Sequence, residues 1–186
     1  EGGDKLRPGG FTELHQASMG IGGVNNRIYV DATSAKSAED MLALLRKTLG
    51  SLPVVPMMTA EPVELTLTEW IRTGELPAGF LIGEEAELVA ILEHGGKVRC
   101  KKQDLMSDEV RTHIEAGKVV TQLGLDWQER LQFRVSDDLS IKAIKYSDML
   151  TQQNDDIDRE DQRARMLADF ILFTSEFHSF FSGLVA

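Results

Sequence analysis

The clearest hydrophobic pattern in this chain is an alternation of apolar and polar side chains in its second half. It runs from Lys118 to Asp126 and again from Arg130 to Val135. Because successive side chains of a strand point to opposite faces, each stretch predicts a strand with one apolar and one polar face. The predicted apolar faces contain Val119, Thr121, Leu123 and Leu125, then Leu131, Phe133 and Val135; the predicted polar faces contain Lys118, Val120, Gln122 and Asp126, then Arg130, Gln132 and Arg134.

Helical patterns with capping signals occur at three places. The first predicted helix is Ala35–Leu49, which is capped by Ser34 and ends at Gly50. The second is a short helix that begins at the capping box Thr66–Glu69 and ends at Gly74. The third is capped by Ser107, runs through Glu115 and ends at Gly117. Ser and Thr are favoured at helix N-termini, and glycine is favoured just past the C-terminus. Further helices are expected near 148–152, at 159–167 and at the C-terminus around Phe177.

Shorter apolar runs predict additional strands, and most neighbouring strands are close enough in sequence to pair as hairpins. The expected strands are Glu13–Met19, Arg27–Asp31, Phe80–Ile82, residues 86–92 with Lys97–Gln103 as their hairpin partner, Ser140–Tyr146 and Phe170–Phe173. This order predicts an α+β fold of mainly antiparallel sheets with helices packed on them. We expect an incomplete N-terminal part, residues 1–75, and a C-terminal part, residues 76–186, that contains the basic strand face.

Composition is that of a soluble globular protein, with 42% hydrophobic and 27% charged residues among 186. No apolar run approaches the ~20 residues that span a bilayer, and residues 1–10 lack the apolar segment of a signal peptide. The single cysteine, Cys100, fits a reducing compartment. We therefore expect a cytoplasmic protein, and the absence of an initial methionine suggests a fragment of a longer one.

Charge is distributed unevenly along the chain. The window from Lys97 to Lys145 holds ten Lys and Arg against eight Asp and Glu, so its net charge is +2 within a chain of net charge −10. Screening confines the influence of each charge to about 8–10 Å in physiological salt, so an acidic protein can still present a local basic surface. The window therefore predicts either ordinary solvated charges or a face that binds a polyanion.

Motifs for catalysis or metal binding are weak. Residues 154–161 form an acidic run, but a calcium loop that began at Asn154 would need glycine at Arg159 and glutamate at Arg165. The run fits helix capping better than a metal site. The histidines have no metal-ligand spacing, and no D-x-K or E-x-K core follows a suitable strand. We predict no enzyme activity, no catalytic residue, no metal and no cofactor.

Basic residues flank the predicted helix that begins after Ser107. Lys101, Lys102 and Gln103 precede this helix and Lys118 follows it, so we expect them at the same rim of the sheet. Aromatic residues are sparse there, which favours phosphate contacts over base stacking. The candidate DNA-binding residues are Lys101, Lys102, Gln103, Lys118, Arg130, Arg134 and Lys142.

Several long motifs resemble the recombination-associated protein RdgC family. They are AKSAEDMLALLRKTLGSLPVVP, ELTLTEWIRTG, CKKQDLMSDEV, HIEAGKVVTQLGLDWQERLQF and QNDDIDRED, in this order from about Ile28 to Leu184. The likeness upstream of Ile28 is thin and is carried by Pro8 and Phe11, at positions where the family has Pro-x-x-Phe. The family's N-terminal portion is missing.

The resemblance implies a nucleoid-associated DNA-binding protein that has no catalytic activity and binds with little sequence preference. Family members form ring-shaped homodimers around double-stranded DNA and restrain RecA-promoted strand exchange in recombination and replication-fork repair. By position, Lys102, Gln103 and Lys118 match the family's basic DNA-facing stretch, and Phe11 matches an aromatic residue near the dimer contact. We expect this chain to bind DNA on an open face. The alternatives are single-stranded DNA as the partner, a metal-dependent nucleic-acid-processing enzyme, and a protein–protein interaction module without DNA contact.

Overall fold

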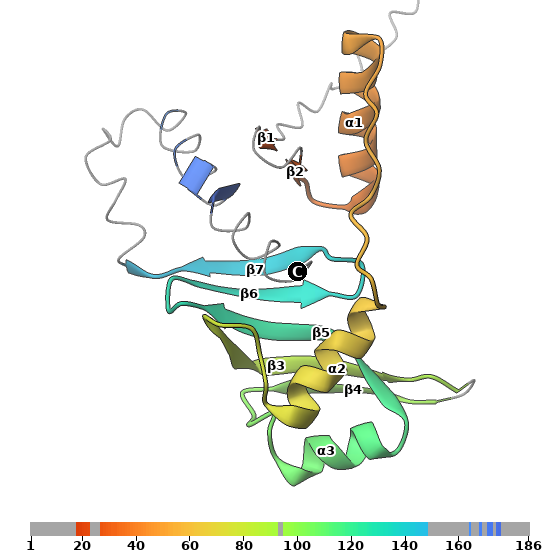
Figure 1. Ribbon diagram of the computed structural model, residues 1–186, viewed down its shortest axis with the longest axis vertical. Coiled ribbons are helices and arrows are strands. Elements are labelled where there is room, and N and C mark those ends of the chain that lie inside the picture. Colours follow the sequence, from red (N-terminus) through yellow and green to blue (C-terminus); the bar gives the residue numbers. More distant parts are fainter. Residues whose placement is uncertain are drawn as a thin grey trace, which may run out of the picture. The chain divides into compact units, whose positions relative to one another are not determined.

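The alternating stretch that begins at Lys118 forms the middle strand of a five-stranded antiparallel sheet in the computed structural model (Figure 1). The strand order is β4-β3-β5-β6-β7, with bounds β3 Phe80–Ala90, β4 Lys97–Lys101, β5 Lys118–Trp127, β6 Leu131–Ser136 and β7 Ile141–Tyr146. The predicted run Phe80–Ile82 and the predicted run 86–92 belong to one long strand, β3. The predicted α+β fold class is confirmed.

The structure describes residues 18–22, 27–92 and 95–148, together with residues 164, 168, 171, 172, 174 and 175. These residues fall into two units, Glu1–Val54 and Val55–Ala186. The predicted division into residues 1–75 and 76–186 stays a prediction. The predicted strand Phe170–Phe173 is wrong at Ile171 and Leu172, which are helical. Phe11, residues 154–161 and Phe177 lie outside the described residues.

The first unit contains a hairpin and one helix. Strands β1 (Ser18–Gly22) and β2 (Arg27–Asp31) pair antiparallel, and α1 covers Ala35–Leu49. The bounds of α1 are those predicted, and the predicted cap is confirmed because Ser34 Oγ accepts a hydrogen bond from Ser37 N at 3.1 Å. Among the described side chains of α1, none is buried.

The second unit buries one face of its sheet under helices α2 (Val63–Thr73) and α3 (Asp108–Glu115). Cross-strand partners share a face of the sheet, so the pairs Leu88–Val120, Leu125–Phe133 and Trp127–Leu131 place these side chains together. Helix α2 adds Leu67, Trp70 and Ile71, all buried. Fully burying each such side chain contributes about 1.5–3 kcal/mol to stability. We call this side of the sheet the core face.

The predicted faces of β5 are wrong over its first residues. Val120 is fully buried on the core face and pairs with Leu88, whereas Gln122 pairs with Glu87. From Glu87 to Leu88 the pairing advances one residue along β3, but from Gln122 to Val120 it advances two residues along β5. Thr121 is therefore the extra residue of a β-bulge. The bulge exchanges the two faces, so Lys118 and Val120 lie on the core side and Val119 lies on the other. A constant period of two cannot show such a reversal.

The start of α2 is also predicted incorrectly. The helix begins at Val63, after Pro62, so Thr66 lies inside the helix rather than at its cap. Thr68 contacts the sheet instead: its Oγ1 accepts a hydrogen bond from Val120 N at 2.8 Å and donates one to Glu64 O at 2.6 Å. The end at Gly74 is confirmed, with φ of 74° and a hydrogen bond from its N–H to Trp70 O. Of the helices described here, none is long and apolar enough to cross a membrane.

Candidate nucleic-acid interface

The sheet face opposite the core face carries most of the charged strand residues, and we call it the polar face. Cross-strand pairing places Glu85 beside Lys101, Glu87 beside Arg99 and Val89 beside Lys97. Near the opposite edge of the sheet, Arg134 pairs with Lys142, and Gln132 pairs with Lys145. The cations of the polar face are Lys97, Arg99 and Lys101 on β4, Arg134 on β6, and Lys142 and Lys145 on β7; its carboxylates are Glu85 and Glu87 on β3 and Asp126 on β5.

Strand β4 presents a row of cations because Lys97, Arg99 and Lys101 occupy every second position. Alternate residues of a strand point the same way and lie about 6.6–6.8 Å apart. Between them, Val98 and Cys100 point to the core face, where Cys100 is buried. The period of two therefore places the apolar side chains of this edge strand on the core face and its cations on the polar face.

Glu87 is a buried carboxylate beneath this row. Its residue is only 6% exposed, and it is contacted by Lys97 Nζ at 3.1 Å and Arg99 Nε at 2.8 Å. The hydroxyl of Thr121, the extra residue of the β5 bulge, lies 3.3 Å from Glu87 Oε1. Burial raises the pKa of Glu87, but the hydrogen bonds and charges of Arg99 and Lys97 outweigh it, so the pKa lies below its ordinary value. Glu87 is therefore ionised at neutral pH.

Arg134 lies on β6, next to the edge strand β7 of the polar face, and its ion pair is longer than those of Glu87. Its Nη1 lies 3.4 Å from Glu85 Oε2, and the side chains of Arg134 and Glu85 are 30% and 45% exposed. Lys142 and Lys145 on the neighbouring edge strand are both exposed. They share a face although they are three positions apart, because a register shift occurs between Gln132 and Arg134, and Ala143 has a φ of 53°. The polar face is thus basic along both edge strands.

The structure brings together three of the predicted DNA-binding residues, Lys101, Arg134 and Lys142, on the polar face. The other four lie elsewhere. Lys102 is in the turn after β4 with a φ of 52°, and Gln103 donates from its side chain to Glu109. Lys118 lies on the core side of β5, and Arg130 is in the turn between β5 and β6.

The expectation that Lys101 and Lys118 lie at the same rim of the sheet is wrong. Lys101 pairs with Glu85, whereas Lys118 pairs with Ala90 five residues further along β3. At about 3.3 Å per residue, this separates the two positions by roughly 16 Å. The chain travels the length of the sheet through α3, so residues on either side of this helix reach opposite ends.

Three cations of the polar face are not among the predicted DNA-binding residues: Lys97, Arg99 and Lys145. The first two have a local signal, since Lys97, Arg99 and Lys101 alternate with Val98 and Cys100 in the same way as the residues of β6. Lys145 has no such signal, because only the irregular pairing of β7 aligns it with Lys142. Local periodicity finds the first kind of residue and misses the second.

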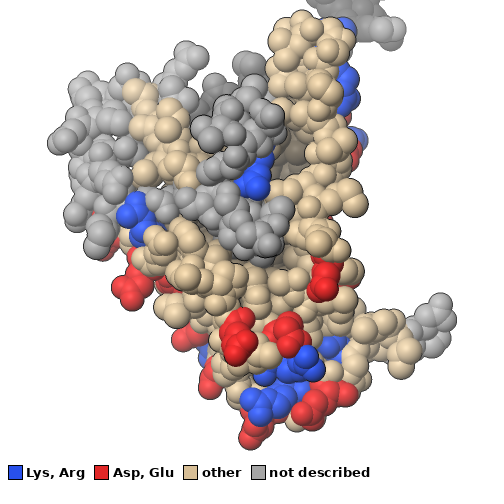
Figure 2. All heavy atoms as spheres, viewed as in Figure 1, with Lys and Arg blue, Asp and Glu red and all other residues tan. Residues whose placement is uncertain are grey.

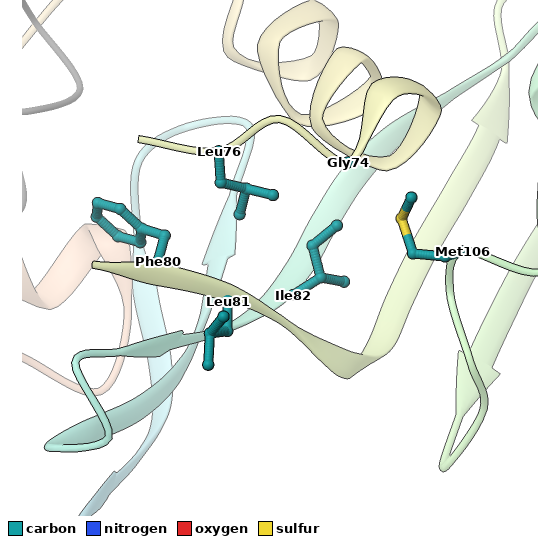
Figure 3. Close-up of a pocket in the computed structure, with 6 residues that line it drawn as sticks. All are labelled: Gly74, Leu76, Phe80, Leu81, Ile82 and Met106. Carbon is teal, nitrogen blue, oxygen red and sulfur yellow. The ribbon is translucent and has the colours of Figure 1, made fainter. Parts of the chain in front are cut away.

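The helix side of this unit has a different charge pattern. Figure 2 shows Lys and Arg side chains closely interspersed with Asp and Glu around α3, which itself carries Asp108, Glu109, Arg111 and Glu115. An apolar pocket of about 310 Å³ lies near the end of α2 and is lined by Gly74, Leu76, Phe80, Leu81, Ile82 and Met106 (Figure 3). These lining side chains offer no acid, base or nucleophile for catalysis.

Metal-binding and nucleophilic chemistry is sparse in the part of the chain that the structure describes. No group of three or more His, Cys, Asp and Glu residues there is arranged to hold a metal ion. Burial raises the pKa of the Cys100 thiol, and the charge of Glu109 raises it further, so this cysteine is a poor nucleophile. The arrangement best supported by the described side chains is contact between cations and an anionic polymer.

Comparison with known proteins gives one consistent family. A family model described as "Putative exonuclease, RdgC" matches residues 3–186. The chain is 63% identical over 171 residues to the recombination-associated protein RdgC of Serratia proteamaculans, an alignment that covers 92% of this chain and 56% of that protein. It is 59% identical over 180 residues to the protein of the same name from Yersinia enterocolitica, covering 97% and 59%. The chain thus spans little more than half the length of these relatives.

Proposed function

This chain belongs to the RdgC family, and from that premise we propose that it binds double-stranded DNA without sequence preference and acts in recombination without catalysing a reaction. The name of these relatives associates them with recombination. The finer parts of the proposal are a nucleoid location in the cytoplasm, modulation of RecA-dependent recombination and replication-fork repair, and, for full-length members of the family, assembly into a ring-shaped homodimer.

The polar face is the observation that carries the proposal. Its cations come from both edge strands and from β6, and they outnumber its carboxylates. Glu85 and Glu87, two of these carboxylates, already pair with Arg134 and with Lys97 and Arg99. Duplex DNA carries one negative charge per about 1.7 Å of axis, and cations that neutralise phosphates release condensed counterions. Such a surface therefore favours DNA even though the chain has a net charge of −10.

Lack of sequence preference follows from the kinds of side chain on this face. Lys and Arg contact phosphates, which position a protein on DNA but carry no base sequence. Base stacking needs aromatic side chains, and the polar-face positions of the described strands contain none. Trp127 and Phe133, the aromatic residues of β5 and β6, are buried on the core face.

A nuclease is the second candidate, because the matching family model is described as an exonuclease. Metal-dependent cleavage would need carboxylates that converge on a metal ion. On the polar face, Asp126 is engaged by Gln132 Nε2 at 3.2 Å and by Glu129 N at 2.8 Å, and the other two carboxylates pair with cations. These contacts favour binding over cleavage.

The proposal is tested by fluorescence anisotropy with a labelled duplex at several salt concentrations. Lys101→Glu and Lys142→Glu each replace an exposed cation of the polar face, and the matched control Lys47→Glu replaces an exposed cation of α1. We expect each face variant to weaken binding to all duplex sequences and to lower the slope of log K against log[salt] by about 1, because one phosphate contact is lost. Lys47→Glu should change neither quantity.

Three results would contradict the proposal. One is salt-independent binding by the wild-type chain. Another is equal loss of affinity in all three variants, which would mean that the polar face is not a site. The third is shortening of an end-labelled duplex in the presence of Mg²⁺ or Mn²⁺, which would favour the nuclease.

A further inference from the structure

We infer that Glu87 is a positioning residue that holds Arg99 and Lys97 on the polar face as a phosphate-binding pair, with Arg99 as the bidentate member. The inference rests on the proposed function and deepens it. Glu87 lies on β3, opposite the basic row of β4, and this role explains why a carboxylate lies on a face that binds an anion.

The position of Glu87 sets the geometry. It lies on β3 between β4 and β5, directly across from Arg99 and from Gln122. Its side chain is 9% exposed, whereas those of Lys97 and Arg99 are 52% and 67% exposed. The carboxylate therefore lies beneath the two cations, and a phosphate that approaches from solvent meets the cations first.

The atoms used in these contacts leave the phosphate-binding groups available. Arg99 contacts Glu87 Oε2 at 2.8 Å through Nε, the guanidinium nitrogen closest to the backbone of Arg99. Its two terminal Nη groups form the end of the guanidinium fork, and this fork matches two oxygens of a phosphate. Lys97 uses Nζ, which carries three N–H donors, in a 3.1 Å contact with Glu87. One carboxylate thus orients both side chains and occupies few of their donors.

Thr121 fixes the carboxylate in turn. As the extra residue of the β5 bulge, it brings its hydroxyl within 3.3 Å of Glu87 Oε1. A long cationic side chain on an exposed edge strand otherwise loses rotamer freedom when it binds phosphate. Here that freedom is already restricted before DNA arrives. The bulge, the buried carboxylate and the cation row are therefore one preorganised arrangement.

The alternative role for Glu87 makes the opposite prediction. If Glu87 only neutralises its neighbours, replacing it with a neutral residue adds one positive charge to the face and strengthens DNA binding. If it positions Arg99 and Lys97, the same replacement weakens binding although the net charge becomes more favourable. The sign of the effect therefore separates the two roles.

The experiment measures duplex binding by Glu87→Gln, with Glu84→Gln as the matched control. Glu84 is an exposed neighbour on β3, so its replacement changes the charge equally. We expect Glu87→Gln to bind about 3–10-fold more weakly and to lower the salt slope by about 1–2, which corresponds to one or two lost phosphate contacts. Glu84→Gln should bind as well as the wild type or slightly better.

A second variant, Arg99→Lys, tests the route through Arg99. It keeps the charge but lacks Nε and the fork, so it should weaken binding to a similar extent. Adding Glu87→Gln to Arg99→Lys should then cost less than Glu87→Gln costs alone. Circular dichroism and the melting temperature establish whether each variant is folded. If Glu87→Gln does not fold, Arg99→Lys alone tests the inference.

The outcomes separate the inference from the function on which it rests. Tighter binding by Glu87→Gln, or full affinity in Arg99→Lys, overturns the positioning role even when Lys142→Glu weakens binding. Salt-independent binding, or none, by the wild-type chain overturns the proposed function and the inference together. Weaker binding that is additive in the double variant shows that Glu87 does not act through Arg99.

Discussion

Glu87 combines burial with a full negative charge, and this makes it sensitive to pH. Burial raises its pKa, while Arg99 and Lys97 lower it by more, so the folded-state pKa lies below the ordinary value of 4.5. A carboxyl group with a lowered pKa contributes stability above its unfolded-state pKa, and the contribution is lost as the pH falls through the folded-state pKa. The ion pairs of Glu87 therefore stabilise the protein at neutral pH and lose this effect in acid.

We expect Glu87→Gln to lower the free energy of unfolding by about 1–2 kcal/mol at pH 7, in line with hydrogen bonds to charged groups. The two partner cations are more than half exposed and remain hydrated, so no buried charge is left unpaired. Urea unfolding from pH 7 to pH 3 checks this. The difference between wild type and variant should be constant above about pH 5 and shrink below pH 4.5. A difference that grows in acid would contradict the assigned pKa direction.

Helix α2 and strand β5 are joined by more than apolar contact. The bulge at Thr121 leaves Val120 N donating to Thr68 Oγ1 at 2.8 Å, so a helix side chain satisfies a strand amide on the core side. Buried amides without a partner are costly. Thr68 therefore stabilises the irregular register that also places Thr121 beside Glu87.

Thr68→Val should lower the free energy of unfolding by about 1–3 kcal/mol, because the valine has nearly the same shape but leaves the Val120 amide without its acceptor. Thr112→Val on α3 is the control: the Thr112 hydroxyl also bonds the carbonyl four residues earlier, at 2.8 Å, but this site is exposed. The control should cost less than about 0.5 kcal/mol. Urea unfolding of both variants gives the comparison, and equal losses would show that the contact with Val120 contributes nothing.

At the scale of the whole molecule, the charge of the polar face contrasts with the net charge of the chain. The chain has a net charge of −10, yet the polar face of one unit is basic along both edge strands. For the proposed function, we expect acidic residues elsewhere to repel DNA and to favour its approach to the polar face. Attraction of this kind is strong at low salt and weakens steeply as salt is added.

We expect the 186-residue chain, tested by itself, to leave circular and linear duplexes of equal length at the same rate. Phosphate contacts on one face of a sheet break without any need to open a closed assembly. The dissociation rate from both DNA forms at one salt concentration tests this. Much slower release from the circle would mean that copies of the chain enclose the duplex, as the proposed ring does.

Local features of the sequence determined much of this protein. The bounds of α1 followed from its capping serine, apolar stripe and terminal glycine. Strands β5 and β6 followed from a period of two, and so did the polar position of Arg134, because this signal depends only on neighbouring residues. The family was recognisable from motifs alone, and the comparisons confirm it.

Only the tertiary structure decided which cations act together. The bulge at Thr121 reversed the faces of β5, and the register shift near Ala143 aligned Lys145 with Lys142. Strand pairing separated Lys101 from Lys118 and placed Glu87 under Arg99. Register depends on contacts between residues far apart in the chain, and one extra residue moves every following side chain to the other face. For this reason, the period of a single strand predicts a basic face but not its members.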